Sequence, residues 1–145
     1  MKELPFDPEN IPKPAGSYEV VLILGKTAYI SGQVSRTATG ILAGKVENDA
    51  DLSLAREAAR ISTQRCLAAI HQQFGNLDVI EQVLMVRGFI NADPDFTRHP
   101  EVMDAASEWL ITALGKRGHH ARAAVGVASL PGGGLTEIEM TVALK

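Results

Sequence analysis

The sequence lacks the features that mark several specialised classes of protein. Cys66 is the one cysteine in 145 residues, so no disulfide can form within the chain, and a reducing compartment is expected. The net charge of −3 gives no basic face of the kind that nucleic-acid-binding proteins carry. No apolar run approaches the length of a membrane span, and the N-terminus has no apolar signal segment. We therefore expect a cytoplasmic protein that binds neither nucleic acid nor membranes.

The composition is otherwise that of an ordinary globular domain. A hydrophobic content of 46% with 21% charged residues supplies a core without help from a metal or a disulfide. We expect one domain over residues 1–145. Residues 1–16 should form an extended arm on it, because four of the chain's prolines disfavour regular structure there: Pro5, Pro8, Pro12 and Pro14.

Alternating side chains predict a β-hairpin after this arm. Residues 18–24 and 27–31 each alternate with a period of two, and Gly25-Lys26 between them suits a tight turn. Residues 35–50 hold glycines and scattered polar groups, which predicts a loop.

Helical periodicity follows in two segments, residues 53–74 and 100–114. Gly75 and Gly115 stand where each helix would end. The apolar stripe of the first helix consists mostly of Ala, Ser and Cys, so this helix can lie close against a sheet. Cys66 lies within the stripe, which favours a packing role over a nucleophilic one.

Three further segments alternate as strands, namely residues 80–91, 122–128 and 136–144. One side of the second carries a guanidinium followed by very small side chains: Arg122, Ala124, Gly126 and Ala128. Small side chains beside an arginine leave room for a ligand, and the guanidinium fork suits a carboxylate or a phosphate. The third strand carries polar groups on one side and apolar groups on the other, and the polar ones are Glu137, Glu139 and Thr141.

The order of the elements predicts an α+β domain, with one mixed sheet and two helices packed on one face. If Val125 and Met140 pack on the helices, the side chains of Arg122 and Glu137 point away from them, on the open face of the sheet. A sheet face with so few polar groups needs a cover, and self-association is the simplest one.

Other interpretations of these residues stay open. An arginine at a strand end is more often a surface residue or a structural ion-pair partner, and Glu137 could simply be solvated. Asp93 and Asp95 lack the third ligand that a metal site would need. His119 and His120 form a polar connector, and either could lie near Arg122.

Six short motifs in this order resemble the YjgF/RidA family, also called endoribonuclease L-PSP-like, over residues 18–144. They are Gly16-Ser17-Tyr18, Tyr29-Ile30-Ser31-Gly32-Gln33, Phe89-Ile90-Asn91, Asp95-Phe96, Ala121-Arg122-Ala123-Ala124-Val125 with Leu130-Pro131, and Glu137-Ile138-Glu139. The run from His120 to Pro131 is most similar to a divergent branch of the family.

The resemblance implies a chorismate-mutase-like fold and a homotrimeric barrel with clefts between subunits. Typical members hydrolyse reactive enamines and imines, such as 2-aminoacrylate, to a 2-keto acid and ammonia without a metal or an organic cofactor. The resemblance implies that Arg122 holds the carboxylate of the ligand and that Glu137 helps to position the catalytic water. It places Tyr18 and Ser31 or Gly32 in the cleft. Many members carry a cysteine where this sequence has Ala124.

Three functional hypotheses follow. The first is a Rid-type imine deaminase, in which Arg122 anchors the substrate and Glu137 orients water and moves a proton. The second is a trimer that binds a small carboxylate, such as a 2-keto acid, without turnover, as a regulator would. The third, a ribonuclease, fits the net charge of −3 poorly.

The spacing of Arg122 and Glu137 bears on whether one chain can supply both residues to a site. In a simple hairpin around Pro131, Arg122 and Glu137 would lie roughly 15–20 Å apart along the sheet. A carboxylate at that distance cannot orient water on a ligand held by Arg122. Either the hairpin is wrong or Glu137 comes from a neighbouring subunit, and we expect the neighbouring subunit, because a shared cleft also explains the exposed sheet face.

Overall fold

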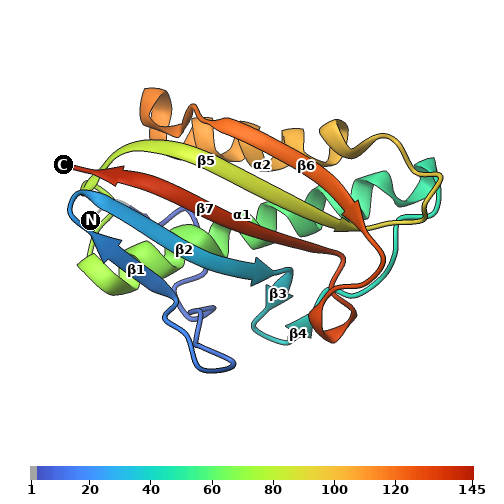
Figure 1. Ribbon diagram of the computed structural model, residues 1–145, viewed down its shortest axis with the longest axis horizontal. Coiled ribbons are helices and arrows are strands. Elements are labelled where there is room, and N and C mark those ends of the chain that lie inside the picture. The colour runs from blue at the N-terminus through green and yellow to red at the C-terminus, as the bar shows by residue number, and fades with distance from the viewer. Residues whose placement is uncertain (1–2) are drawn as a thin grey trace.

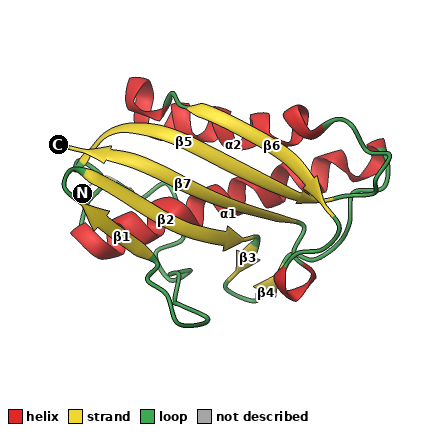
Figure 2. Cartoon of the chain, in the orientation of Figure 1, coloured by secondary structure: helices red, strands yellow, loops and turns green. Residues whose placement is uncertain are grey.

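The alternating and helical segments of the sequence fold into two layers in the computed structural model, which describes residues 3–145 (Figures 1 and 2). Both helices lie behind one sheet, so that they cover one of its faces and leave the other open. The elements are β1 (Val21–Leu24), β2 (Thr27–Val34), β3 (Arg36–Thr37), β4 (Gly40–Ile41), α1 (Leu52–Phe74), β5 (Ile80–Asn91), α2 (His99–Leu114), β6 (Ala121–Val127) and β7 (Thr136–Leu144). The expected fold class, one mixed sheet with two helices on one face, is confirmed.

The strands of the main sheet lie in the order β1-β2-β7-β5-β6. Neighbouring strands are antiparallel except β5 and β6, which are parallel because α2 carries the chain back between them. β6 and β7 do not form a hairpin, which was one of the two alternatives that the sequence left open, since β5 lies between these two strands. β3 and β4 form a separate two-stranded ribbon within the segment that was expected to be a loop.

Small side chains bring α1 close to the sheet, as the sequence predicts. Ala55, Ala59, Ser62 and Cys66 are fully buried. The Ser62 and Thr136 hydroxyl oxygens lie 2.9 Å apart, which ties the helix to the start of β7. Burial raises the pKa of the Cys66 thiol far above its ordinary value, so it stays protonated. This confirms a packing role for Cys66.

Glycines set the ends of both helices. Gly75 follows α1 with φ of 79°, a left-handed conformation that favours glycine, and its amide donates to the carbonyl of His71. Gly115 follows α2 with φ of 62°. Residues 3–16 contain no helix or strand, and residues 1–2 of the predicted arm lie outside the described residues.

The two faces of β6 are opposite to those that the sequence pattern suggested. Arg122 pairs with Val86, whose side chain is fully buried on the helix side, and Ala124 packs against the core. A side chain at Gly126 would collide with the ring of His99 at the start of α2. The small residues thus make room for α2 rather than for a ligand. Val125 lies on the open face, with 46% of its surface exposed.

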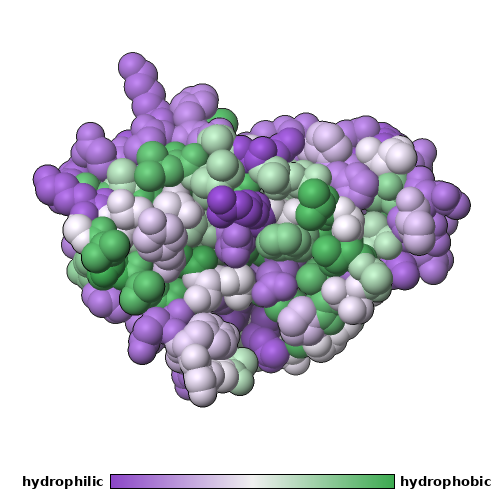
Figure 3. Space-filling model, viewed as in Figure 1, coloured by the Kyte–Doolittle hydropathy of each residue, from purple (hydrophilic) through white to green (hydrophobic). Residues whose placement is uncertain are grey.

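The open face of the sheet carries several large apolar side chains. Leu22, Leu24 and Tyr29 are exposed on β1 and β2, and Val125 is exposed on β6. Figure 3 shows hydrophobic surface on either side of a more hydrophilic centre over this face. Neither helix, nor any other helix of residues 3–145, has the length and apolarity needed to cross a membrane.

Gly88 offers a test of how closely α2 packs on the sheet. A Cβ at this position of β5 would overlap the side chain of Met103. We expect Gly88→Ala to lower the free energy of unfolding by about 1–3 kcal/mol, because the core has no space for the methyl group. Urea unfolding followed by circular dichroism measures this change.

Gly16→Ala is the matched control for this substitution. A Cβ at Gly16 meets nothing closer than the ring of Tyr18 at 3.7 Å, which is an ordinary contact. We expect its free energy of unfolding to stay within about 0.5 kcal/mol of the wild-type value. Equal effects of the two substitutions would contradict close packing at Gly88.

Candidate functional site

One cleft is lined by four of the residues that the sequence marks as candidates. Tyr18, Ser31, Gly32 and Glu137 contribute to a cavity of about 850 Å³. Its walls are the N-terminal arm, the end of β2, the β3–β4 ribbon and the loop before β7. A volume of this size lies in the range of clefts that bind small molecules.

An irregularity in β2 creates the floor of this cleft. The pairing of β2 with β7 shifts register between Ile30 and Gln33, so that Ser31 and Gly32 lie in a bulge. The Glu137 side chain lies directly over Gly32, and a Cβ at Gly32 would come 2.5 Å from Glu137 Oε1. Gly32 therefore provides the space in which the Glu137 carboxyl group sits.

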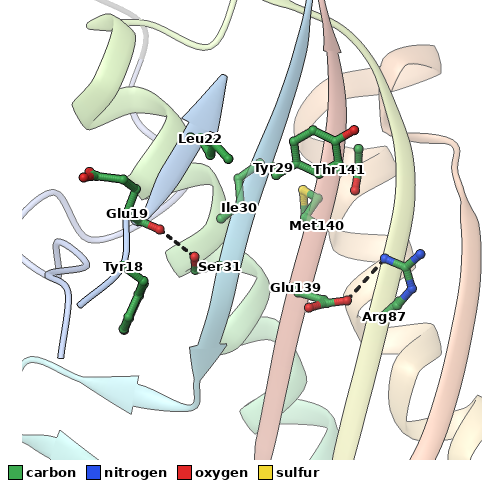
Figure 4. Close-up of a pocket in the computed structure, with 10 residues that line it drawn as sticks. All are labelled: Tyr18, Glu19, Leu22, Tyr29, Ile30, Ser31, Arg87, Glu139, Met140 and Thr141. Atoms are coloured by element: carbon green, nitrogen blue, oxygen red, sulfur yellow. Dashed lines mark hydrogen bonds and ion pairs between the residues drawn. The ribbon is translucent and has the colours of Figure 1, made fainter. Parts of the chain in front are cut away.

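The surroundings of Glu137 favour its protonated form. Burial is the main cause that raises the pKa of Glu137 above its ordinary value, and the nearby charge of Glu139 raises it further. Glu139 itself pairs with Arg87 across the open face, with 3.2 Å between Oε1 and Nη1 (Figure 4). A carboxyl group with a raised pKa is suited to accept and return a proton during a reaction.

A second, smaller cavity of about 360 Å³ adjoins the cleft along the open face of the sheet (Figure 4). Tyr18, Ser31 and Glu139 line both cavities. The Ser31 hydroxyl donates a hydrogen bond to the carbonyl of Glu19 at 2.6 Å, which holds β2 to the chain before β1. The Tyr18 hydroxyl accepts a hydrogen bond from the amide of Ala15 at 3.1 Å. Both hydroxyl groups are thus held in place by the backbone.

Arg122 does not line this cleft. Its Nη1 donates to Asp104 Oδ1 at 2.9 Å and to Ser107 Oγ at 3.0 Å, and both partners lie on α2. Among residues 3–145, Nε and Nη2 of Arg122 form no hydrogen bond. That edge of the guanidinium, which carries two parallel donors, is available to a carboxylate.

His120 completes a small network around Arg122. His120 Nδ1 lies 2.6 Å from the carbonyl of Gly118, so Nδ1 carries the proton in the neutral ring. Nε2 then accepts the Ser107 hydroxyl proton at 2.8 Å. Burial chiefly lowers the pKa of His120, helped by the charges of Arg122 and His119, which favours this neutral form. Of the two candidate histidines, His120 is the one that lies near Arg122.

Arg122 and Glu137 do not meet within one chain. Arg122 is aligned with Val86 and Met140 across the sheet, whereas Glu137 lies three residues before Met140. This places the two roughly 10 Å apart along the strands and roughly 10 Å apart across them. They also lie on opposite faces. Ala124 shares the helix-facing side of β6 and is absent from the cleft lining as well.

Sequence reasoning missed the cations of the cleft, Lys13, Arg36 and Arg65. Arg65 belongs to α1 and is only 7% exposed, beside Cys66 in the packed part of the helix. The signal was present, because an arginine within a stripe of Ala, Ser and Cys must be buried or reach around its edge. Nothing in the sequence pattern indicated that the arm and the β3–β4 ribbon would form walls of the cleft.

No group of three or more metal-binding side chains occurs within the described part of the chain, residues 3–145. Asp93 and Asp95 lie at a turn, where the Asp93 carboxylate accepts a hydrogen bond from the amide of Asp95. The cleft instead combines a carboxyl group of raised pKa, two hydroxyl groups and several cations. This set suits proton transfer to a small anionic ligand.

Comparisons with known proteins agree on one family. The family model described as "Endoribonuclease L-PSP" matches residues 8–144. Protein TCP17 of Trypanosoma cruzi is 30% identical over 134 residues, which cover 91% of this chain and 84% of TCP17.

Solved structures share the fold. Protein Atu1372 of Agrobacterium tumefaciens, described as of unknown function, is 35% identical with a TM-score of 0.86, and the match covers 91% of this chain and 85% of Atu1372. RidA from the Antarctic bacterium Psychrobacter sp. PAMC 21119 is 24% identical with a TM-score of 0.65. That match covers 99% of this chain and 100% of RidA, and it is evidence for the fold alone.

The raised pKa of Glu137 has a consequence for stability. The folded protein holds this proton above the ordinary pKa of 4.5, so ionisation at neutral pH costs the folded state more than the unfolded state. The stability that the protonated carboxyl group contributes is fully present below the ordinary pKa and is lost as the pH rises through the folded-state value. We expect Glu137→Gln to raise the Tm at pH 7 by on the order of 1–2 °C, a gain kept small by solvent screening.

Thermal unfolding at pH 7 and at pH 4 measures this effect, and the gain should shrink at pH 4. Glu81→Gln is the matched control, because it removes the same charge from an exposed position on β5. A lower Tm for Glu137→Gln at pH 7, with Glu81→Gln unchanged, would contradict the assigned environment of Glu137.

Proposed function

Because this chain belongs to the endoribonuclease L-PSP family, to which RidA also belongs, we propose that it is a hydrolytic deaminase of reactive imines and enamines. Its products would be a 2-keto acid and ammonia. The observation that carries the proposal is the position of Glu137, over Gly32 in a cleft that Ser31 and Tyr18 also line.

Glu137 has the properties that imine hydrolysis requires of a proton-transfer group. Water must lose a proton as it attacks the imine carbon, and the departing nitrogen must gain one. A carboxyl group whose pKa lies above its ordinary value can serve both steps in turn. Ser31 and Tyr18 line the space beside it, where hydroxyl groups can position the water.

Arg122 would bind the substrate carboxylate in the cleft of a neighbouring subunit. Asp104 and Ser107 hold its Nη1, which leaves the Nε and Nη2 edge for a bidentate carboxylate. β6 lies at an edge of the sheet, where a second copy of the chain can approach. The exposed apolar residues of the open face support self-association as a homotrimer in which clefts form between subunits.

A binding protein without turnover is the second candidate. Ala124, which stands where many relatives carry a cysteine, packs toward α2 and adds no reactive group. Asp104 also partly neutralises Arg122, which lowers its affinity for an anion. Such a trimer would bind a 2-keto acid as a regulatory ligand.

Ammonia release from freshly generated 2-imino acids tests the first candidate. We expect turnover by the wild type, a rate about 10²–10⁴-fold lower for Glu137→Gln, and binding of a 2-keto acid that survives this substitution. Arg122→Lys should weaken the binding of that keto acid by about 1–3 kcal/mol, because an ammonium group cannot form two parallel hydrogen bonds.

Arg60→Lys is the control for Arg122→Lys, since Arg60 forms an exposed ion pair with Glu57 on α1. Keto-acid binding without ammonia release would favour the regulatory candidate. Equal keto-acid affinity of the wild type and Arg122→Lys would contradict a bidentate role for Arg122.

Mixing experiments test the division of the site between subunits. We expect a trimer mass by light scattering at micromolar concentration. An Arg122→Ala chain mixed with a Glu137→Ala chain should regain activity, because some clefts would receive an intact residue from each. A monomeric mass would contradict the proposed assembly. So would activity no higher than that of the separate variants, once subunit exchange is verified.

A further inference from the structure

The cleft around Glu137 is lined by three positively charged side chains. They are Lys13 from the arm, Arg36 from β3 and Arg65 from α1. Among residues 3–145, none of the three forms an ion pair with a carboxylate. Neither carboxylate of the cleft pairs with them, since Glu139 pairs with Arg87 and Glu137 forms no ion pair among residues 3–145.

Arg65 is the most constrained member of this group. It is 7% exposed, and its Nη1 donates to Asn10 Oδ1 of the arm. Asn10 in turn donates to the backbone carbonyl of Arg36 at 2.7 Å, so one side chain links both arginines. The buried Nε of Arg65 has no hydrogen-bond partner among residues 3–145.

This arrangement is costly unless an anion completes it. A buried N–H without a partner costs about 1–3 kcal/mol. Burial is the main cause that lowers the pKa of Arg65, and the charge of Arg36 lowers it further, so both effects disfavour the charged form of Arg65 in the absence of an anion. Guanidinium groups bind carboxylates through pairs of N–H donors, so an anionic group placed between Arg36 and Arg65 would satisfy both.

We propose that Arg36 and Arg65 form an anion-binding subsite and that the ligand of this cleft is a 2-imino or 2-keto acid with a second carboxylate. This inference rests on the proposed function for the first carboxylate, which Arg122 of a neighbouring subunit would bind. The second carboxylate would extend toward Arg65, past Glu137. A cleft of about 850 Å³ has room for a dicarboxylic acid of this kind.

Calorimetry with two keto acids of different charge tests the subsite. 2-Oxoglutarate carries the second carboxylate, and 2-oxobutanoate lacks it. We expect the wild type to bind 2-oxoglutarate about tenfold or more tightly than 2-oxobutanoate, because charge-assisted hydrogen bonds to both arginines form only with the former. Arg65→Gln should abolish this preference.

Arg36→Gln provides a second variant that does not alter the packed helix, and it should reduce the preference as well. Arg60→Gln is the matched control, because it removes the same charge from an exposed position of α1. Equal affinity of the wild type for the two keto acids would overturn the subsite. So would a preference that persists in both Arg65→Gln and Arg36→Gln.

The outcome for the subsite can be separated from that for the deaminase activity. Ammonia release from 2-imino acids without a preference for the dicarboxylate supports the activity and overturns the subsite. A preference that depends on Arg65, without ammonia release, supports the subsite and contradicts the activity. Tighter binding of inorganic phosphate than of 2-oxoglutarate would overturn the dicarboxylate assignment, because the subsite would then favour a phosphorylated ligand.

Discussion

The close approach of α1 to the sheet is the constraint on which this structure depends. It is possible only because the helix presents Ala55, Ala59, Ser62 and Cys66 to β2 and β7, where larger side chains would hold the two layers apart. The same helix carries Arg65, next to Cys66, which lines the cleft. The packing of the core and the charge of the candidate site therefore come from one helix.

The charged groups of the cleft suit an anionic ligand. Glu137 is held over Gly32 near Glu139, and burial favours its protonated form. Arg36 and Arg65 line the same cleft, are linked through Asn10 and have no carboxylate partner among residues 3–145. The buried Nε of Arg65 lacks a hydrogen-bond partner within these residues, and an anionic ligand would supply one.

Much of the fold could be predicted because it depends on local pattern. The strands β5 and β7 and the glycine ends of both helices lie where periodicity placed them. The faces of β6 could not be assigned in this way, since a row of Arg122, Ala124 and Gly126 can make room equally well for a ligand or for a helix. Because β6 pairs in parallel with β5, this side of β6 faces α2 and not a ligand. The same pairing removed the hairpin of β6 and β7.

The sequence by itself determined the two helices and the strands of the main sheet, their order along the chain, the single covered face of the sheet and the family. It also marked Tyr18, Ser31, Gly32 and Glu137, which gather in one cleft because a bulge in β2 lies opposite the start of β7. Only the tertiary structure decided that Arg122 binds Asp104 on α2 and that Arg65 and Arg36 meet at the cleft. These contacts join residues from separate elements, and no periodicity within one element records which residue of another will lie across from it.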